Sequence, residues 1–417
     1  MVHIGVVSGW QTVNIGDVAH TPGTLTALLR HDPDARVTLL ALSLDQRERD
    51  MLTRYFPTVE VVTGRLSDAE WAPEVERFAA EVDVLVHGSG PDMVAHREVA
   101  AWRSRTGKPY GFFGITVDPL RPYIGPLDLS ATMIDSVSGD LVPADRRELL
   151  DGAAFVYCRD VLTATFLQAQ GIRSEVVTFG PDATVLCDFY DDADGAAVLA
   201  EYGLVEGEFI CAVPRLRFTP YHEIRGYEPQ ADDLRKAAYS AGYREHDLAA
   251  LRRGIVAWVR RTGHPALVVP EMSYAVEFAQ AHLAGAFPED VADKVHVLPR
   301  FWELQEAAAV YRRAAGVLSS ECHSPLIAIA EGVPAIYLRQ PTDTIKGAMY
   351  AGLGLGDWVI ELESADPGAA VERAIQRWVD DPAASKQDSQ QGRDRGRALL
   401  DSMAATVRAA AAAPVTA

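Results

Sequence analysis

Residues 316–338 have the sequence Gly316-Val-Leu-Ser-Ser-Glu-Cys-His-Ser-Pro-Leu-Ile-Ala-Ile-Ala-Glu-Gly-Val-Pro-Ala-Ile-Tyr-Leu338. An apolar strand is followed by a polar turn, a short helix and a second apolar strand. Ser324 is a favourable N-cap, Pro325 suits the first helical position, and Gly332 suits the helix end. Two strands joined by a helix predict a right-handed crossover between parallel strands.

The same alternation extends along the chain on both sides of this unit. Further strands are predicted at residues 2–8, 36–42, 59–63, 82–88, 110–117, 154–158 and 174–179, and then at 209–213, 266–270, 295–298 and 358–362. This order is typical of parallel sheets that helices cover on both faces. The sequence therefore predicts an α/β protein with two consecutive domains and an interdomain cleft, which the C-terminal ends of the strands face.

An acidic stretch, residues 189–195, separates the two series of strands and ends in a glycine. We predict a domain boundary there, which gives an N-terminal acceptor domain over residues 1–190 and a C-terminal donor domain over residues 196–382. Residues 383–417 are helical by composition and are expected to pack back on the first domain. Their Ala-rich end, residues 404–417, is expected to fray.

The composition excludes several classes of protein. The chain has 417 residues, with 39 Lys and Arg against 58 Asp and Glu, and a formal net charge of −19. Nucleic-acid phosphates would be repelled by such a chain. No apolar run reaches the roughly 20 residues that cross a bilayer, and the first residues lack the pattern of a signal peptide. The four scattered cysteines are typical of reduced thiols. We therefore expect a cytoplasmic protein with no membrane or nucleic-acid partner.

The helix that follows Ser324 offers a candidate anion site. A helix N-terminus at the C-terminal end of a strand presents free N–H groups and a partial positive charge, which suits a phosphate or a carboxylate. His323 and Ser324 would add side-chain donors to this site. The alternative is purely structural: Ser324 only caps the helix, and His323 only packs against the turn.

Two turns after strands of the first domain are further candidates. Asn14, Gly16 and Asp17 follow the first predicted strand, and Gly88 and Gly90 follow the strand at 82–88. A glycine there would let the backbone approach a ligand closely. Asp17 could act as a general base or accept a hydrogen bond from a sugar hydroxyl. The alternative is an ordinary turn in which Asp17 caps the next helix.

Three arginines lie at predicted strand ends: Arg159 in the first domain, and Arg215 and Arg300 in the second. Guanidinium groups bind phosphates through two parallel hydrogen bonds, so Arg215 and Arg300 would suit a diphosphate. For Arg159 a salt bridge to a surface carboxylate is the alternative. No motif typical of a metal site is present, and we predict neither a metal nor a cofactor.

Together these stretches resemble the polysaccharide pyruvyl transferase family, over roughly residues 14–362. The matching motifs are Asn14-Ile15-Gly16-Asp17, Gly88-Ser89-Gly90, Gly114-Ile115 with Pro119-Leu120, Arg159-Asp160, Gly171, Pro181-Asp182, His323-Ser324 and Gly332-Val333-Pro334. The resemblance implies two Rossmann-like domains, arranged as in the GT-B glycosyltransferases. It also implies a transferase that takes pyruvate from phosphoenolpyruvate.

One position departs from the family's pattern. The family commonly has an arginine two residues before the histidine, whereas this chain has Glu321. A carboxylate opposes binding of a multiply charged anion and would suit a sugar hydroxyl, a ribose or a cationic group instead. Residues 340–356 also resemble the second domain of GT-B glycosyltransferases. We therefore favour a nucleoside-diphosphate sugar as the donor and a small soluble acceptor. Pyruvyl transfer and a non-catalytic sugar-nucleotide-binding protein remain the alternatives. A homodimer is possible.

The candidate roles of the residues follow from the hypothesis of glycosyl transfer. Asp17 and His323 are the predicted catalytic residues. The predicted donor-binding residues are Arg215, Arg300, Glu321 and Ser324. The predicted acceptor-binding residues are Asn14, Gly16, Gly88, Gly90 and Arg159.

Overall fold

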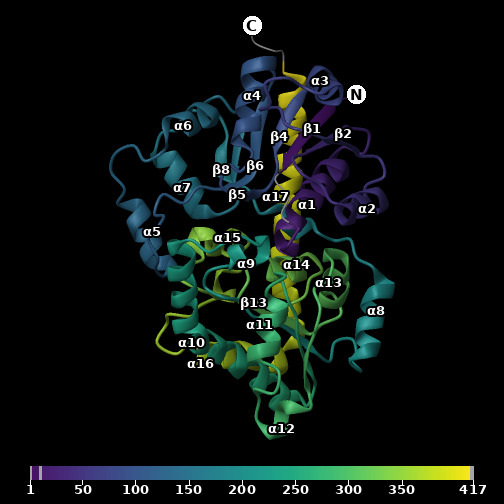
Figure 1. Cartoon of the computed structure of the whole chain (residues 1–417), viewed down its shortest axis with the longest axis vertical. Helices are drawn as coiled ribbons and strands as arrows, with labels where there is room; N and C mark the ends of the chain where they lie inside the picture. Colours follow the sequence, from purple (N-terminus) through teal and green to yellow (C-terminus); the bar gives the residue numbers. More distant parts are fainter. Residues whose placement is uncertain (1, 9–11, 414–417) are drawn as a thin grey trace.

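The computed structural model of the chain describes residues 2–8 and 12–413, and it contains two sheets in which every strand pair is parallel (Figure 1). The first sheet has the order β3-β2-β1-β4-β6-β7-β8, with β5 paired to β6. Its strands are β1 (His3–Ser8), β2 (Arg36–Ala41), β3 (Glu60–Thr63), β4 (Val84–His87), β5 (Gly90–Pro91), β6 (Tyr110–Thr116), β7 (Phe155–Cys158) and β8 (Val177–Phe179).

The second sheet has the order β11-β10-β9-β12-β13-β14. Its strands are β9 (Ile210–Val213), β10 (Ala266–Val268), β11 (Val295–Val297), β12 (Gly316–Ser319), β13 (Ala335–Arg339) and β14 (Val359–Glu361). The α/β prediction is confirmed, and each predicted strand has its counterpart. The two-residue β5 was not predicted, because a Gly-Pro pair carries no strand signal.

We call the part of the chain that carries the first sheet the first unit and the part that carries the second sheet the second unit. The helices of the first unit are α1 (Ile15–His31), α2 (Gln46–Tyr55), α3 (Pro73–Glu81), α4 (His96–Thr106), α5 (Leu127–Asp135), α6 (Ala144–Asp151) and α7 (Val161–Ala169), with the 3₁₀ turn η1 (Ala183–Leu186). Those that follow are α8 (Asp192–Glu201), α9 (Tyr221–Arg225), α10 (Ala231–Thr262), α11 (Ala275–His282), α12 (Glu289–Ala292), α13 (Leu304–Tyr311), α14 (His323–Ala330), α15 (Met349–Gly352), α16 (Pro367–Asp380) and α17 (Pro382–Ala412), with the turns η2 (Thr344–Ala348) and η3 (Gly356–Trp358). None of the helices in the described ranges is both long and apolar enough to cross a membrane.

The acidic stretch at 189–195 is the start of helix α8. Asp191 is the N-cap, and its carboxylate accepts hydrogen bonds from the N–H groups of Ala193 and Asp194 at 2.9 and 3.2 Å. Acidic residues are favourable in a first helical turn because they complement the helix dipole. The charge run that we interpreted as a linker edge is therefore also a helix-start signal.

Helix α17 runs lengthwise along both units (Figure 1). It packs against α1, β4, β6 and β7 of the first unit and against α14 and α16 of the second. Ala404 and Val407 are buried in the large apolar cluster that contains residues of both sheets. The segment from residue 404 to Ala412, which we expected to fray, is helical; Ala404 and Val407 are packed, whereas Ala409 and Ala412 are exposed, and residues 414–417 lie outside the described part.

The topology places the candidate residues. In each sheet the strand order reverses at one point, between β1 and β4 in the first and between β9 and β12 in the second. Ligands of open parallel sheets bind beyond the strand ends at such a reversal. Asn14 and Gly88 follow β1 and β4, and Arg215 and Glu321 follow β9 and β12. The starts of α1 and α14 lie side by side where the two units meet (Figure 1).

Candidate active site

Helix α1 begins at a cap that the sequence did not assign. Asn14 is its N-cap, and its Oδ1 accepts hydrogen bonds from the N–H groups of Gly16 at 2.7 Å and Asp17 at 3.2 Å. Asp17 therefore lies in the first helical turn instead of capping it, and its side chain is 20% exposed. The proposed acceptor-binding role of Asn14 would use the rest of its amide, because the cap occupies Oδ1.

The start of α1 is fastened to the second unit by main-chain hydrogen bonds. The N–H of Ile15 donates to the carbonyl of Glu271 at 3.0 Å, and the N–H of Ser273 donates to the carbonyl of Val13 at 2.9 Å. These bonds join the turn after β1 to the turn after β10. The candidate residues of the two units are thus held in one place, although about 300 residues separate them in the sequence.

Gly16 touches a side chain of the second unit. A Cβ built on Gly16 would lie 2.4 Å from the Cβ of His323 and 2.5 Å from its Nδ1, far inside van der Waals contact. We expected this glycine to admit a ligand. In the structure the group that approaches its backbone is His323. Because Gly16 has no side chain, this predicted catalytic residue can take that position.

The N-terminus of α14 is already occupied by an anion of the protein itself. The N–H and the hydroxyl of Ser324 both donate to Oε2 of Glu271 at 2.7 Å, and the Tyr311 hydroxyl donates to Ser324 Oγ at 3.0 Å. The cap residue is Cys322, so Ser324 lies inside the helix and is not its N-cap. Ser324 does not cap the helix because its own N–H and hydroxyl donate to a buried carboxylate from the turn after β10.

Glu271 was not among the predicted site residues. It is fully buried, and it ends the apolar run that follows β10. A carboxylate directly after a buried parallel strand was the available signal. The sequence could not connect this residue to α14, because that contact depends on the packing of the turn after β10 against a helix more than fifty residues away.

His323 has one nitrogen paired and one nitrogen free of hydrogen bonds. Its Nδ1 is 3.3 Å from Oε1 of Glu271 and 3.5 Å from Sγ of Cys322. Its Nε2 is buried with no hydrogen-bond partner, and it lies 4.0 Å from Oδ2 of Asp182. Burial lowers the pKa of His323, but Cys322 and Glu271 raise it further, so that the pKa lies above its usual value.

A second buried histidine, His20, lies beside the first. The two rings meet edge to face with centroids 4.8 Å apart. His20 Nδ1 is 3.1 Å from Oδ1 of Asp182, and its Nε2 is 3.9 Å from Oδ1 of Asp17. Burial lowers the pKa of His20 although Asp182 opposes that change. His20 was not predicted from the sequence, although it lies one helical turn after Asp17.

Arg159 forms a salt bridge, as in the alternative that we considered, but its partner is the buried carboxylate of Asp182 and not a carboxylate on the surface. Its Nη1 donates to Oδ2 of Asp182 at 2.8 Å, and its Nε donates to the Thr116 hydroxyl at 2.8 Å. The side chain is 1% exposed. In this arrangement Arg159 supports the carboxylate that holds His20.

Arg215 and Glu321, both predicted to contact the donor, are paired with each other. Arg215 Nε is 3.3 Å from Oε2 of Glu321, and Arg215 also pairs with Asp343. Lys346 Nζ is 3.7 Å from Asp343 Oδ1. Burial raises the pKa of Glu321 to about 7, against the opposing effect of Arg215. The predicted anion-binding arginine thus has its charge matched by buried carboxylates.

Other predicted site residues lie apart from this group. Arg300 is bound by Glu306, with Nη1 3.0 Å from Oε2, and none of its contacts in the described ranges involves another candidate residue. Gly88 directly follows β4, and Gly90 is the first residue of β5. A Cβ on Gly88 would lie 3.6 Å from the Val7 carbonyl, and a Cβ on Gly90 would meet nothing within 4 Å. Neither glycine is required there by packing.

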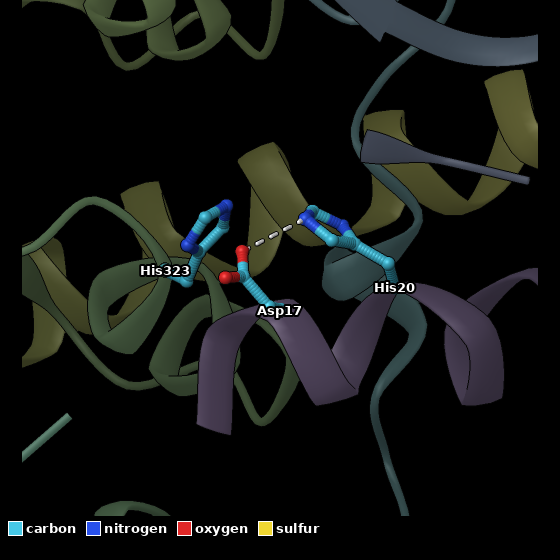
Figure 2. Close-up of side chains that lie close together, drawn as sticks. All are labelled: Asp17, His20 and His323. Carbon is cyan, nitrogen blue, oxygen red and sulfur yellow. Dashed lines mark ion pairs between the residues drawn. The ribbon is translucent and has the colours of Figure 1, made fainter. Parts of the chain in front are cut away.

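Asp17, His20 and His323 converge on one point from two helices, α1 and α14 (Figure 2). One potential ligand atom of each lies within 4.8 Å of the others. The arrangement combines a partly exposed carboxylate with two buried imidazoles, each held at Nδ1 by another carboxylate. Such a group can exchange protons with a substrate, stabilise an anion, or hold a metal ion.

The comparisons with known proteins agree with this organisation. The family described as polysaccharide pyruvyl transferase matches the chain over residues 14–340, a span that contains Asn14, Arg215 and His323. The comparison with curated protein sequences gives no match.

Solved structures resemble the whole chain. They include the UDP-GlcNAc 2-epimerase of Neisseria meningitidis bound to UDP-GlcNAc, with a TM-score of 0.55, 11% identity, and coverage of 98% of this chain and 100% of that chain. A ugt transferase of Siraitia grosvenorii in complex with UDP has a TM-score of 0.54, 14% identity, and coverage of 98% and 100%. The S. aureus MnaA–UDP structure has a TM-score of 0.54, 14% identity, and coverage of 94% and 91%. This likeness shows two Rossmann-like domains of the GT-B type.

Proposed function

This chain belongs to the polysaccharide pyruvyl transferase family, and we propose that it transfers a glycosyl group from a nucleoside-diphosphate sugar to a small soluble acceptor. The observation that carries this proposal is the ion pair between Arg215 and Glu321 at 3.3 Å. The structures of similar fold, solved with UDP or UDP-GlcNAc, add a precedent for such a donor in this architecture.

The charge balance favours a donor whose reacting part is neutral. Phosphoenolpyruvate carries a carboxylate and a phosphate on a very small molecule, and it needs unpaired cations close together. Here Arg159 is paired with Asp182, and Arg215 with Glu321 and Asp343. Carboxylates instead accept hydrogen bonds readily from sugar hydroxyls. A glycosyl donor can place its neutral sugar among these carboxylates and its diphosphate beside His323.

The proposed roles follow from exposure and protonation. Asp17 has the most exposed side chain of the three residues in Figure 2, so we assign to it the proton of the acceptor hydroxyl as that oxygen bonds to the anomeric carbon. The bond from that carbon to the diphosphate breaks, and its electron pair leaves with the diphosphate. His323, whose pKa is raised, offsets the developing charge through Nε2.

Pyruvyl transfer is the second candidate, because it is the reaction in the family's description. It would require Glu321 to be protonated or displaced so that Arg215 could bind the donor's anionic groups. A protein that binds sugar nucleotides without catalysis is the third possibility.

Isothermal titration with UDP-, TDP- and GDP-sugars and with phosphoenolpyruvate separates these candidates. We expect saturable binding of a nucleotide sugar and its turnover with a hydroxylated acceptor. Binding of phosphoenolpyruvate without any nucleotide response would overturn the proposal in favour of pyruvyl transfer. Tight nucleotide-sugar binding without turnover across a broad acceptor panel would support the non-catalytic alternative.

A further inference from the structure

We propose that Asp17, His20 and His323 form a binding site for a divalent transition-metal ion such as Zn²⁺, with a coordination position open to an oxygen atom from a substrate. The candidate ligand atoms lie within 4.8 Å of one another, and the side chains point toward a common centre (Figure 2). Two imidazoles and one carboxylate are a ligand set that suits Zn²⁺ better than the oxygen-seeking Mg²⁺.

The first observation is the orientation of His20. Its Nδ1 is 3.1 Å from the Asp182 carboxylate, so an Nδ1–H donates there and the lone pair is on Nε2. That nitrogen faces Asp17 Oδ1 at 3.9 Å. A carboxylate that holds the far nitrogen of a ligand histidine is the usual support of a metal site, because it fixes the ring and raises its basicity.

The second observation is independent and comes from the other unit. His323 has the same arrangement, with Nδ1 3.3 Å from the Glu271 carboxylate. Its side chain is 6% exposed, yet Nε2 has no hydrogen-bond partner. A buried polar atom without a partner costs free energy, because nothing replaces the hydrogen bonds that it made to water. A metal ion at the centre of Figure 2 would satisfy it.

Geometry and charge both permit the ion. Zn²⁺ ligands at about 2.1 Å in a tetrahedral site are about 3.4 Å apart, whereas these atoms lie up to 4.8 Å apart, so the side chains must close by up to about 1.4 Å. Asp17 is best able to move, since it is partly exposed in a first helical turn. Arg159 Nη1 donates a hydrogen bond to His20 Nε2 at 3.5 Å, which a metal ion would displace, and Asp182 neutralises that guanidinium at 2.8 Å.

The inference deepens the proposed function without depending on its donor. A metal ion on Nε2 of His323 would replace the proton there and supply the same positive charge beside the leaving group, while Asp17 would bind the ion through one carboxylate oxygen and keep the other for the acceptor proton. With three protein ligands, the open position would take an oxygen atom of the donor or the acceptor. Metal binding itself can be measured with no donor present, so the two proposals can fail separately.

The experiment measures binding of Zn²⁺ by titration calorimetry, and of Co²⁺ by its absorption spectrum, to the full chain stripped with a chelator. We expect one ion per chain and Co²⁺ bands typical of nitrogen and oxygen ligands. Asp17→Asn and His20→Gln should each weaken binding by about a hundredfold or more, beyond the ~10–100-fold typical of losing a supporting partner.

The matched control is His31→Gln. His31 lies on the same helix and also pairs with a carboxylate, Asp401, at 2.8 Å, but it is outside the cluster. It should leave affinity unchanged. Circular dichroism checks that each variant folds, and Asp17→Asn keeps the test valid if His20→Gln does not fold. Less than about 0.1 ion per chain, or equal affinity in wild type, Asp17→Asn and His31→Gln, would overturn the proposal.

Discussion

At the scale of single residues, Glu321 determines the preference for one donor over another. Its carboxylate is buried beside Arg215, and burial raises its pKa to about 7. Below that pH the group becomes neutral, and the positive charge of Arg215 is less fully matched. Anion binding at this site should therefore strengthen as the pH falls through about 7.

We expect Glu321→Gln to bind phosphoenolpyruvate at least about tenfold more tightly than wild type at pH 8, because unit charges about 4 Å apart interact by about 4 kcal/mol at an effective dielectric constant of about 20. The variant should also lose the pH dependence near 7. Titration calorimetry between pH 6 and 8 measures both effects. Glu48→Gln is the control, since Glu48 is another buried carboxyl whose pKa burial raises to about 8. Equal affinity in wild type and Glu321→Gln would mean that Glu321 does not face the donor.

The same buried carboxyl affects stability with a definite sign. The folded-state pKa of Glu321, about 7, lies above its unfolded value, so the folded state binds more protons between about pH 4.5 and 7. The free energy of unfolding should therefore contain a contribution that falls as the pH rises through this window. Urea unfolding from pH 5 to 8 should show a smaller fall in Glu321→Gln than in wild type. An identical pH profile in the two proteins would contradict this assignment.

Gly16 is the other single residue with a sharp consequence. An added methyl group would overlap His323, whose Cβ and Nδ1 lie 2.4 and 2.5 Å from the position that a Cβ would take. Gly16→Ala should lower the free energy of unfolding by about 1–3 kcal/mol, as overpacking does, and should impair turnover by displacing His323. Donor turnover and urea unfolding measure the two effects. Unchanged turnover would show that the position of His323 is not critical.

At the scale of elements, helix α1 is fixed by its contact with η1. A Cβ on Gly23 would lie 2.0 Å from the carbonyl oxygen of Ala183, a main-chain atom that cannot easily move. Gly23→Ala should therefore destabilise the protein by at least about 1–3 kcal/mol. Gly242 lies inside α10, and a Cβ there would meet nothing within 4 Å. Gly242→Ala should stabilise by about 0.5–1 kcal/mol. Thermal unfolding of both variants tests this contrast, and the same sign for both would refute it.

The elements also show which sequence signals were sufficient. The strands were predicted because each is a short, nearly continuous apolar run, as in β1 and β12. The sequence predicts a long helix near residues 231–262, as observed for α10, although Gly242 and Gly254 lie within it. Helices α5 and α6 were not predicted, since proline and glycine break the pattern around them. Helix α14 begins at His323, two residues before the start that Ser324 would give as the N-cap. The reason is that Glu271, which is far away in the sequence, accepts the hydrogen bond of the Ser324 N–H in place of a local cap.

At the scale of the whole molecule, α17 joins the two units. The Ser389 hydroxyl donates to the Val333 carbonyl at 2.8 Å in the second unit, and Thr406 is hydrogen-bonded to Tyr157 of β7 at 2.8 Å in the first. The largest buried apolar cluster also contains residues of both sheets. We therefore expect the two units to unfold together.

Calorimetry should show a single transition, although the chain contains two sheets. Met403→Ala removes a buried side chain of α17 and should destabilise by about 2–5 kcal/mol, shifting the whole transition without splitting it. Val205→Ala, at an exposed position, should change stability by no more than about 0.5 kcal/mol. A transition that divides in Met403→Ala, with one part unshifted, would show that the units unfold independently.

The sequence by itself determined the alternation of strands and helices, the two parallel sheets and the strand ends at which Asp17, Arg215 and His323 lie. These are consequences of local hydrophobic pattern and chain direction. Only the tertiary structure decided what each charge faces: Glu271 at the start of α14, Asp182 between Arg159 and His20, Glu321 against Arg215. The physical reason is that the partner of a buried charge is set by the packing of segments far apart in the chain. No local sequence pattern encodes which distant segment will pack there.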